Sequence, residues 1–241
     1  MLLRARRNEP ENMKKPKPIL IVAGIIGLLF LVCFYILWSG TLDYVPNWMI
    51  RLQNKMHASS CRRAAEWGDA EAQQQLALCY LSGMGVPRDA AEAVKWFHKA
   101  AEQGNKQAHC DLANCYYNGR GVPEDKAEAI RRYHIAAELG DCEAQWKLGA
   151  CYLNGIEVQK NEEEAAKWFR KSAEHDYYYA QYLIGRCYYE GTGVPKDDNK
   201  ALDWLWKARW SLDEAADLIK EIQSGNPRSP DPEWGKTIHS L

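Results

Sequence analysis

The chain has 241 residues, 26% of them charged, and its formal net charge of −1 excludes a general electrostatic attraction to nucleic acid. Its length allows one or two domains. Ten tryptophans and 13 tyrosines supply enough large side chains for a substantial hydrophobic core.

Residues 1–17 form a basic segment that we expect to be cytoplasmic, and residues 18–39 follow it without a charge. A helix needs about 20 apolar residues to cross a hydrocarbon core about 30 Å thick. The uncharged run exceeds the ~7–15 apolar residues of a cleavable signal peptide, and the bulky Trp38 occupies a position where cleavage requires a small residue. Residues 18–39 are therefore predicted to be a transmembrane signal anchor.

The orientation of this anchor follows from its flanking charges. Cytoplasmic flanks carry the excess of Lys and Arg, and six such residues precede the run. We expect a single-pass inner (cell) membrane protein whose residues 40–241 are periplasmic or otherwise extracytoplasmic, with residues 40–54 as a linker. A lipid-modified Cys33 is the alternative; it is disfavoured because Val32 is not small and the apolar run continues beyond Cys33.

The rest of the chain repeats itself at a constant interval. Segments beginning at Asp69, Asn105, Asp141 and Tyr177 align at an offset of 36 residues without a gap. The shared columns include Ala72/Ala108/Ala144/Ala180, Leu76/Leu112/Leu148/Ile184, Ala77/Ala113/Gly149/Gly185, Tyr80/Tyr116/Tyr152/Tyr188 and Gly83/Gly119/Gly155/Gly191. A period of this length indicates a solenoid of repeated helical units.

Each unit is predicted to contain two helices. The first spans about 70–82 in unit one, where apolar and small residues recur every three or four positions, and Gly83 ends it. Asp89 and Glu92 predict a capping box that begins the second helix. In unit three, Glu157 and Gln159 replace the second glycine and the proline of the turn, so we expect that turn to differ.

The ends of the array are predicted to be half repeats. Residues 48–67 match the second helix of a unit, residues 212–223 match a first helix, and residues 224–241 are expected to be a flexible tail. Since no unit can bury its apolar face alone, stacking is obligatory. The predicted fold is an all-α, right-handed α/α superhelical solenoid of about four 36-residue repeats at 55–223, preceded by one transmembrane helix.

The strings LALCYLSGMGVPRDAAEAVKWFHKAAEQG (76–104) and LANCYYNGRGVPEDKAEAIRRYHIAAELG (112–140) closely resemble the Sel-one-like repeat (SLR) family, a tetratricopeptide-related class of helical pairs. The resemblance covers about 55–223. It implies a non-enzymatic adaptor, as in envelope signalling, polysaccharide assembly and host contact. Some membrane-anchored bacterial members resemble immunity proteins that neutralise secreted (type VI-type) phospholipase toxins, so toxin immunity in the periplasm is the alternative function.

A partner-binding surface is predicted on columns of the first helix that the repeat does not fix. In stacked helical pairs the first helices line the concave wall, and aromatics and arginine dominate binding hot spots. The predicted residues are Leu78, Leu81, Tyr117, Trp146, Leu153, Tyr182, Arg186 and Tyr189. Extra packing between repeats is the alternative explanation for this apolar strip.

No catalytic, cofactor or metal motif is recognised, so the chain is predicted to be a non-enzymatic membrane-anchored scaffold that binds a protein, without a cofactor and without nucleic acid. The column Cys79/Cys115/Cys151/Cys187 has one cysteine per unit, too far apart for a shared zinc ion or a disulfide, and indicates core packing. Two alternatives stay open: a disulfide involving Cys61, Cys110 or Cys142, and an enzyme that uses His109 and Cys110.

Overall fold

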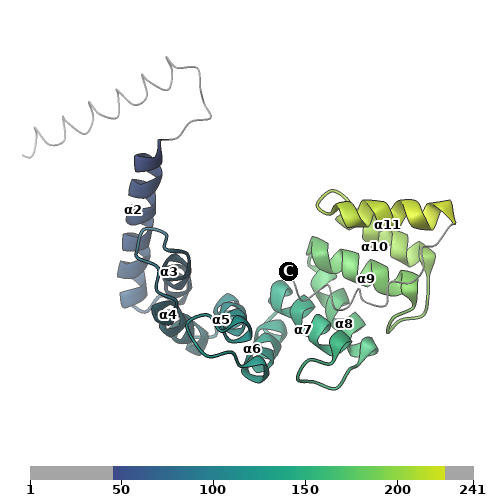
Figure 1. Cartoon of the computed structure of the whole chain (residues 1–241), viewed down its shortest axis with the longest axis horizontal. Coiled ribbons are helices and arrows are strands. Elements are labelled where there is room, and N and C mark those ends of the chain that lie inside the picture. Colours follow the sequence, from purple (N-terminus) through teal and green to yellow (C-terminus); the bar gives the residue numbers. More distant parts are fainter. Residues whose placement is uncertain (1–45, 226–241) are drawn as a thin grey trace, which may run out of the picture. The chain divides into compact units, whose positions relative to one another are not determined.

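The computed structural model describes residues 46–225, which contain ten helices and no strand (Figure 1). Residues 51–225 belong to one compact unit. Among the described helices, none combines the length and the apolar character needed to cross a membrane. The predicted anchor at 18–39 lies outside the described residues and stays a prediction, as does the right-handed sense of the solenoid.

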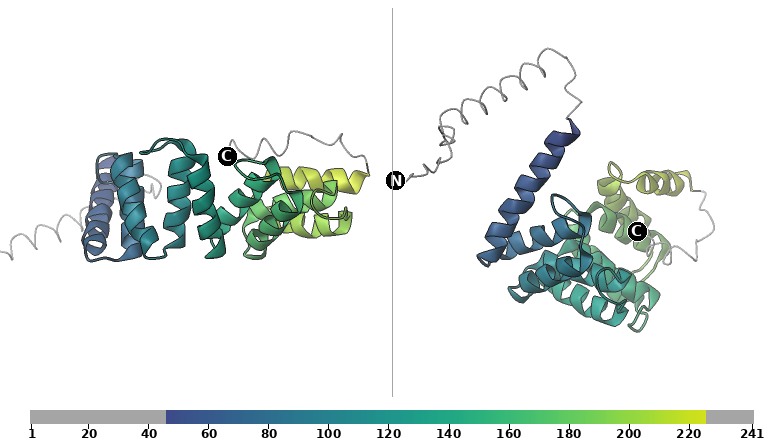
Figure 2. Two further views of the ribbon diagram at one scale, coloured as in Figure 1. Left: turned by 90° about the horizontal axis from the view of Figure 1, so that it is seen from below. Right: turned by 60° about the vertical axis from the view of Figure 1, so that its left-hand side comes forward.

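The helices alternate between two kinds, which we call A and B after their order within a unit. The A helices are α3 (Ala70–Ser82), α5 (Lys106–Asn118), α7 (Cys142–Asn154), α9 (Tyr178–Glu190) and α11 (Asp213–Ser224). The B helices are α2 (Asn47–Glu66), α4 (Ala90–Glu102), α6 (Lys126–Glu138), α8 (Glu162–Glu174) and α10 (Asp198–Ala208). From α3 onward, each helix packs against the next one in the chain (Figures 1 and 2), as expected for an all-α solenoid.

Local capping explains where these helices begin and end. The Asp69 carboxylate accepts a hydrogen bond from the Ala72 N–H at 2.7 Å, and Gly83 ends α3 in the left-handed region with φ 78°. The predicted first helix at 70–82 is thus confirmed. The capping box at the start of α4 is only half formed.

The Asp89 carboxylate accepts from the Glu92 N–H at 2.9 Å, as predicted. The Asp89 N–H, however, donates to the Tyr80 carbonyl at 2.9 Å, and the Glu92 carboxylate pairs with Lys95 instead. The reciprocal half of the predicted box was wrong because the preceding A helix already supplies an acceptor for that N–H.

The turn of unit three keeps one backbone hydrogen bond of its neighbours. The Asn161 N–H donates to the Tyr152 carbonyl at 2.9 Å, the same bond that joins Asp89 to Tyr80 in unit one. Glu157 adopts φ 50° in the place of the glycine. A single non-glycine residue in the left-handed region costs about 1–2 kcal/mol, which the surrounding repeat contacts can offset.

Small residues let the A and B helices of one unit approach closely. A Cβ added at Gly149 in α7 would lie 2.7 Å from Phe169 Cε1 in α8, and one at Gly185 would lie 2.9 Å from Leu205 Cγ. Phe97, Phe169 and Leu205 are fully buried. The glycine column therefore makes room for the large side chains that fill the core of each pair.

Both ends of the array follow the half-repeat prediction. At the amino-terminal end, α2 is a B helix, and it begins at Asn47, so residues 47–54 of the expected linker are helical. At the other end, α11 is an A helix that buries Ala215 and Ile219. The expected tail at 224–241 lies outside the described residues beyond Gly225.

Candidate partner-binding surface

The predicted binding residues lie along one side of the A helices, which we call the A-helix face. Trp146 and Leu153 on α7 are buried, with 7% and 5% of their surface exposed, and belong to a core cluster. Tyr182 and Tyr189 on α9 are half-buried and pack against the same cluster. On this side of α7 and α9, some predicted residues therefore pack between repeats, and others are partly exposed to solvent.

The other predicted residues sit farther along the array. Leu78 and Leu81 on α3 are half-buried against the core of unit one. Tyr117 on α5 is half-buried against the next core cluster, with the Lys126 ammonium 5.6 Å from its ring centre. These three pack against other core clusters than the one that holds Trp146.

The aromatic part of the A-helix face includes a tyrosine that the sequence prediction omitted. Tyr179 meets Trp146 edge-to-face, with ring centroids 4.9 Å apart, and its ring lies 6.3 Å from that of Tyr182. Burial is the main cause that raises the pKa of Tyr179 to about 12. These rings form a continuous edge from α7 to α9.

Arg186 is held in the middle of α9 by two neighbours. Its Nε lies 2.8 Å from a carboxylate oxygen of Glu190, and a terminal nitrogen donates to the Tyr182 hydroxyl at 3.3 Å. Burial, the largest single effect, lowers the pKa of the Arg186 guanidinium, but the hydrogen bonds and charges of Glu190 and Tyr182 together outweigh it and raise that pKa. The cation is thus fixed in place within the aromatic group.

The face continues onto α11 through Tyr189. Its hydroxyl donates to Glu221 Oε1 at 3.0 Å. Burial, followed by the hydrogen bond to Glu221, raises the pKa of Tyr189 to about 12. The carboxylate of the terminal half repeat therefore belongs to the same surface.

A polar group occupies the face between α3 and α7. Gln74 Nε2 donates to Asp111 Oδ2 at 2.6 Å, and Lys147 Nζ donates to Asn114 Oδ1 at 2.6 Å and pairs with Glu143 at 2.7 Å. Burial raises the pKa of Asp111 to about 6, and the Gln74 hydrogen bond partly opposes this rise. Gln74 and Asn114 stand in the variable columns but were left out of the predicted binding set. Asp111, Glu143 and Lys147 lie one to three positions from those columns.

The cysteine column lies in the core. Cys79, Cys115, Cys151 and Cys187 are 3% exposed or less, and no disulfide joins the cysteines of the described residues. Burial raises the pKa of Cys115 to about 11 and of Cys151 to about 12, which suppresses thiolate reactivity. Within residues 46–225, no three His, Cys, Asp or Glu side chains are grouped to hold a metal ion.

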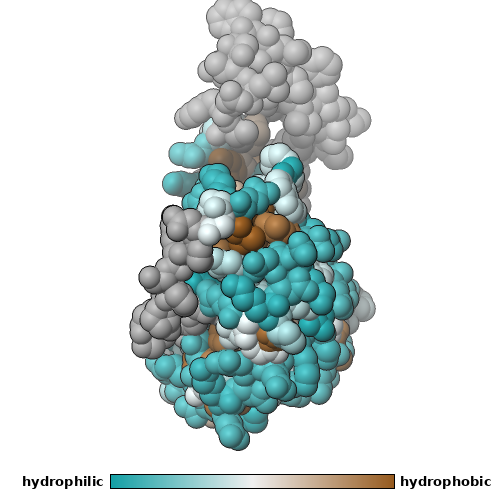
Figure 3. Space-filling view, turned by 90° about the vertical axis from the view of Figure 1, so that its right-hand side faces the viewer, coloured by the Kyte–Doolittle hydropathy of each residue, from teal (hydrophilic) through white to brown (hydrophobic). Residues whose placement is uncertain are grey.

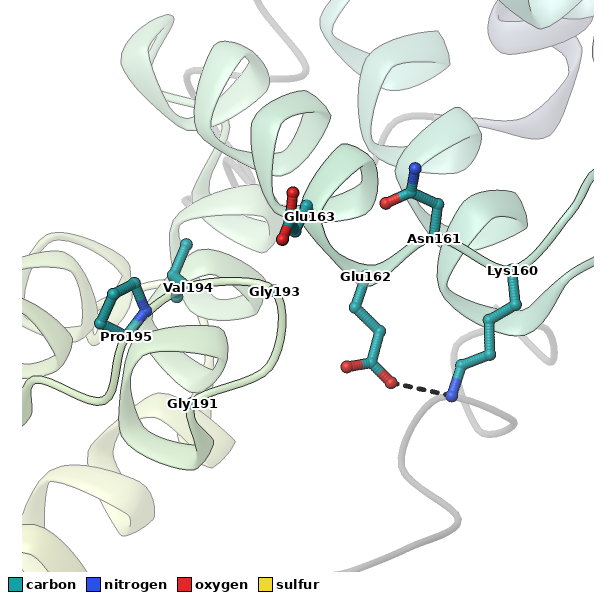
Figure 4. A pocket seen from close by; sticks show the side chains of 8 residues that line it. All are labelled: Lys160, Asn161, Glu162, Glu163, Gly191, Gly193, Val194 and Pro195. Atoms are coloured by element: carbon teal, nitrogen blue, oxygen red, sulfur yellow. Dashed lines mark ion pairs between the residues drawn. The ribbon is translucent and has the colours of Figure 1, made fainter.

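An open pocket of about 650 Å³ lies where unit four packs on unit three (Figure 4). The turn Gly191–Pro195 forms one wall and the start of α8 the other, with Lys160 and Glu162 paired at 2.8 Å. A Cβ at Gly193 would overlap the Glu162 carbonyl. The pocket is thus the outer edge of a tight backbone junction, and its lining carries no nucleophile paired with a base.

The Sel1 repeat family model matches residues 70–105, 106–141, 142–177 and 179–208, more than half of the chain. The chain belongs to the Sel1 repeat family. The matched ranges hold α3 to α10, so the Sel1 repeats correspond to the four complete helix pairs. No curated protein matches the sequence.

Solved Sel1 repeat proteins resemble this chain over its array. A protective antigen of uropathogenic Escherichia coli and a Sel1 repeat protein from Oxalobacter formigenes each share 35% identity over 70% of this chain, with a TM-score of 0.67. The matches span 37% and 50% of those proteins. An immunity protein from Pseudomonas aeruginosa matches at 19% identity over 79% of this chain and 84% of its own, with a TM-score of 0.38.

Proposed function

We propose that this Sel1 repeat protein is a non-enzymatic scaffold whose A-helix face holds a protein partner. The observation that carries the proposal is the edge of aromatic side chains from Trp146 through Tyr179 and Tyr182, with Arg186 fixed beside it. Tyrosine, tryptophan and arginine supply most of the binding energy in protein interfaces. The predicted anchor at 18–39 would tether this scaffold to a membrane, with the repeats on the extracytoplasmic side.

The partial burial of these rings suits a binding role. A half-buried ring held by its neighbours loses little side-chain entropy when a partner covers it. Since Trp146 is mostly buried, its replacement by alanine would create a cavity costing about 3–5 kcal/mol. The half-buried Tyr179 and Tyr182 are therefore the better positions for testing binding.

Crosslinking pull-downs from intact membranes with the full-length chain test the proposal. The double variant Tyr179→Ala, Tyr182→Ala should retain partners about 30-fold less well than the parent chain, since an interface hot spot contributes about 2 kcal/mol. Tyr178→Ala is the matched control, because Tyr178 lies on the same helix and is exposed. Circular dichroism of all variants checks that helicity is unchanged.

Equal capture by the parent chain and the double variant would overturn the A-helix face as the binding site. A captured phospholipase, lost in the double variant, would favour toxin immunity as the purpose of the scaffold. Captured envelope assembly proteins with the same dependence on Tyr179 and Tyr182 would favour a structural adaptor.

A further inference from the structure

The first helix of the array, α2, exposes more large apolar side chains than any other described helix. It is one continuous helix whose only buried residues are Ala58 and Ala65. Trp48, Leu52 and Met56 are 52%, 51% and 66% exposed. Because these three are spaced four residues apart, they form one row along the helix, which we call the α2 apolar row.

A basic row lies beside the α2 apolar row. Arg51 and Lys55 are exposed, and each stands one position before an apolar residue of that row. Glu66, the last residue of α2, is the only carboxylate of the helix and lies three turns beyond Lys55. A helix with an apolar side flanked by Lys and Arg is typical of segments that lie on anionic membrane surfaces.

The position of α2 in the chain favours a lipid bilayer as the surface that covers this row. Only residues 40–46 separate α2 from the predicted anchor at 18–39. The chain from residue 39 to residue 47 spans at most about 30 Å, so an inserted anchor would hold the start of α2 within that distance of the bilayer. Tryptophan, the first residue of the row, is enriched at membrane interfaces.

A second copy of the chain is a poorer match for the exposed side of α2. The B helix α2 lacks an A helix, and only α11, an A helix without its B helix, would complete a pair between copies. In α9, Gly185 makes room for Leu205 of its own B helix. In α11, the residue that follows the buried Ile219 is Lys220, which is exposed and pairs with Asp217 at 3.0 Å.

The carboxyl-terminal end thus places a long charged side chain where a further B helix would have to approach. The side of the molecule at which α10 and α11 lie is also mainly hydrophilic, with a hydrophobic area among the polar residues (Figure 3). A polar terminal unit ends a repeat array by preventing further stacking. The apolar row of α2 therefore calls for a different occupant from the end of another array.

We infer that the first turns of α2 lie on an anionic lipid bilayer, with the α2 apolar row among the headgroups and Arg51 and Lys55 beside lipid phosphates. The inference rests on the anchor in the proposed function and not on the A-helix face. Arg62 of the same helix donates to the Tyr80 hydroxyl of α3 at 2.8 Å, which joins α2 to the array. The bilayer contact would therefore orient the repeats relative to the membrane.

NMR of the full-length chain in lipid nanodiscs tests the inference, with carbon-13-labelled methionine methyl groups as the probe. Anionic discs contain phosphatidylglycerol and phosphatidylcholine, and neutral discs contain phosphatidylcholine alone. A 5-doxyl lipid in either disc broadens the signals of nearby methyl groups, and Met56→Leu identifies the Met56 signal. We expect this signal to lose about half of its intensity or more in anionic discs, and to recover in neutral discs and at high salt.

The double variant Arg51→Gln, Lys55→Gln should restore most of the Met56 signal in anionic discs. The control variant Lys167→Gln, Lys171→Gln removes two charges at the same spacing from exposed positions on α8, and it should leave the broadening unchanged. Equal Met56 intensity in anionic and neutral discs, or equal effects of the two variants, would overturn the inference.

Flotation of reconstituted phosphatidylcholine vesicles at high salt reports on the anchor separately. If the chain floats with these vesicles but its Met56 signal is not broadened in anionic discs, the anchor stands and the α2 contact is refuted. If the chain leaves these vesicles but shows the broadening in anionic discs at low salt, the α2 contact stands and the anchor is refuted. Neither result depends on the A-helix face, which the pull-down with Tyr179→Ala, Tyr182→Ala tests.

Discussion

Replacing Gly193 by alanine is expected to destabilise the junction between units three and four by about 2 kcal/mol. Gly193 has φ 67°, a left-handed conformation that costs alanine about 1 kcal/mol. Its new Cβ would overlap the Glu162 carbonyl in the first turn of α8. The backbone must shift to relieve that overlap, which destabilises the folded chain by about 1–3 kcal/mol more. The lower entropy of the unfolded alanine chain returns about 0.4–1 kcal/mol.

Gly191→Ala is the matched control for this prediction. Gly191 also has a left-handed φ of 77°, but its Cβ would meet Lys196 Cβ at 3.5 Å, an ordinary contact. It should therefore cost about 1 kcal/mol or less. Urea unfolding of the full-length chain, followed by far-UV circular dichroism, gives both values, and hydrogen exchange in α9 and α10 locates the loss. Equal destabilisation by the two variants would refute the carbonyl contact as the cause.

Two further predictions concern single positions. Glu157→Gly should raise the free energy of unfolding by about 0.5–1 kcal/mol, because it relieves a left-handed φ of 50° at the cost of a more flexible unfolded chain. Thermal melts check this prediction. A lower stability of the variant would show that the Glu157 side chain contributes more than its backbone strain costs. Burial raises the Asp111 pKa from 3.8 to about 6, so the folded chain binds a proton that the unfolded chain releases, and the Asp111 contribution to stability should increase as the pH falls from about 6 to about 4. Urea unfolding of the parent chain and of Asp111→Asn, measured across this pH range, checks the prediction. The variant should lack the increase, and the same pH dependence of unfolding free energy in both chains would contradict the assignment.

The candidate surface was only partly predictable from the sequence. Variable columns identified Tyr182, Arg186 and Tyr189, which the structure places on α9 together, but they also selected Leu153, which is 5% exposed. Variation between repeats marks positions that the helix pair does not require, and both packing between units and solvent exposure satisfy that condition. Tyr179 was missed because it lies three positions before the nearest predicted column, and Glu221 was missed because it lies in a half repeat.

The sequence by itself determined the helix pairs, their 36-residue register and most of their ends, because side-chain periodicity, caps and left-handed glycines act within a few residues of one another. Only the tertiary structure decided which acceptor the Asp89 N–H takes, that Glu157 adopts a glycine-like conformation, and which side chains of α7, α9 and α11 meet. The Asp89 bond joins residues nine positions apart through the turn within one unit. The contacts of Trp146 with Tyr179 and of Tyr189 with Glu221 join residues 33 and 32 positions apart, which stacking of one unit on the next brings within contact distance.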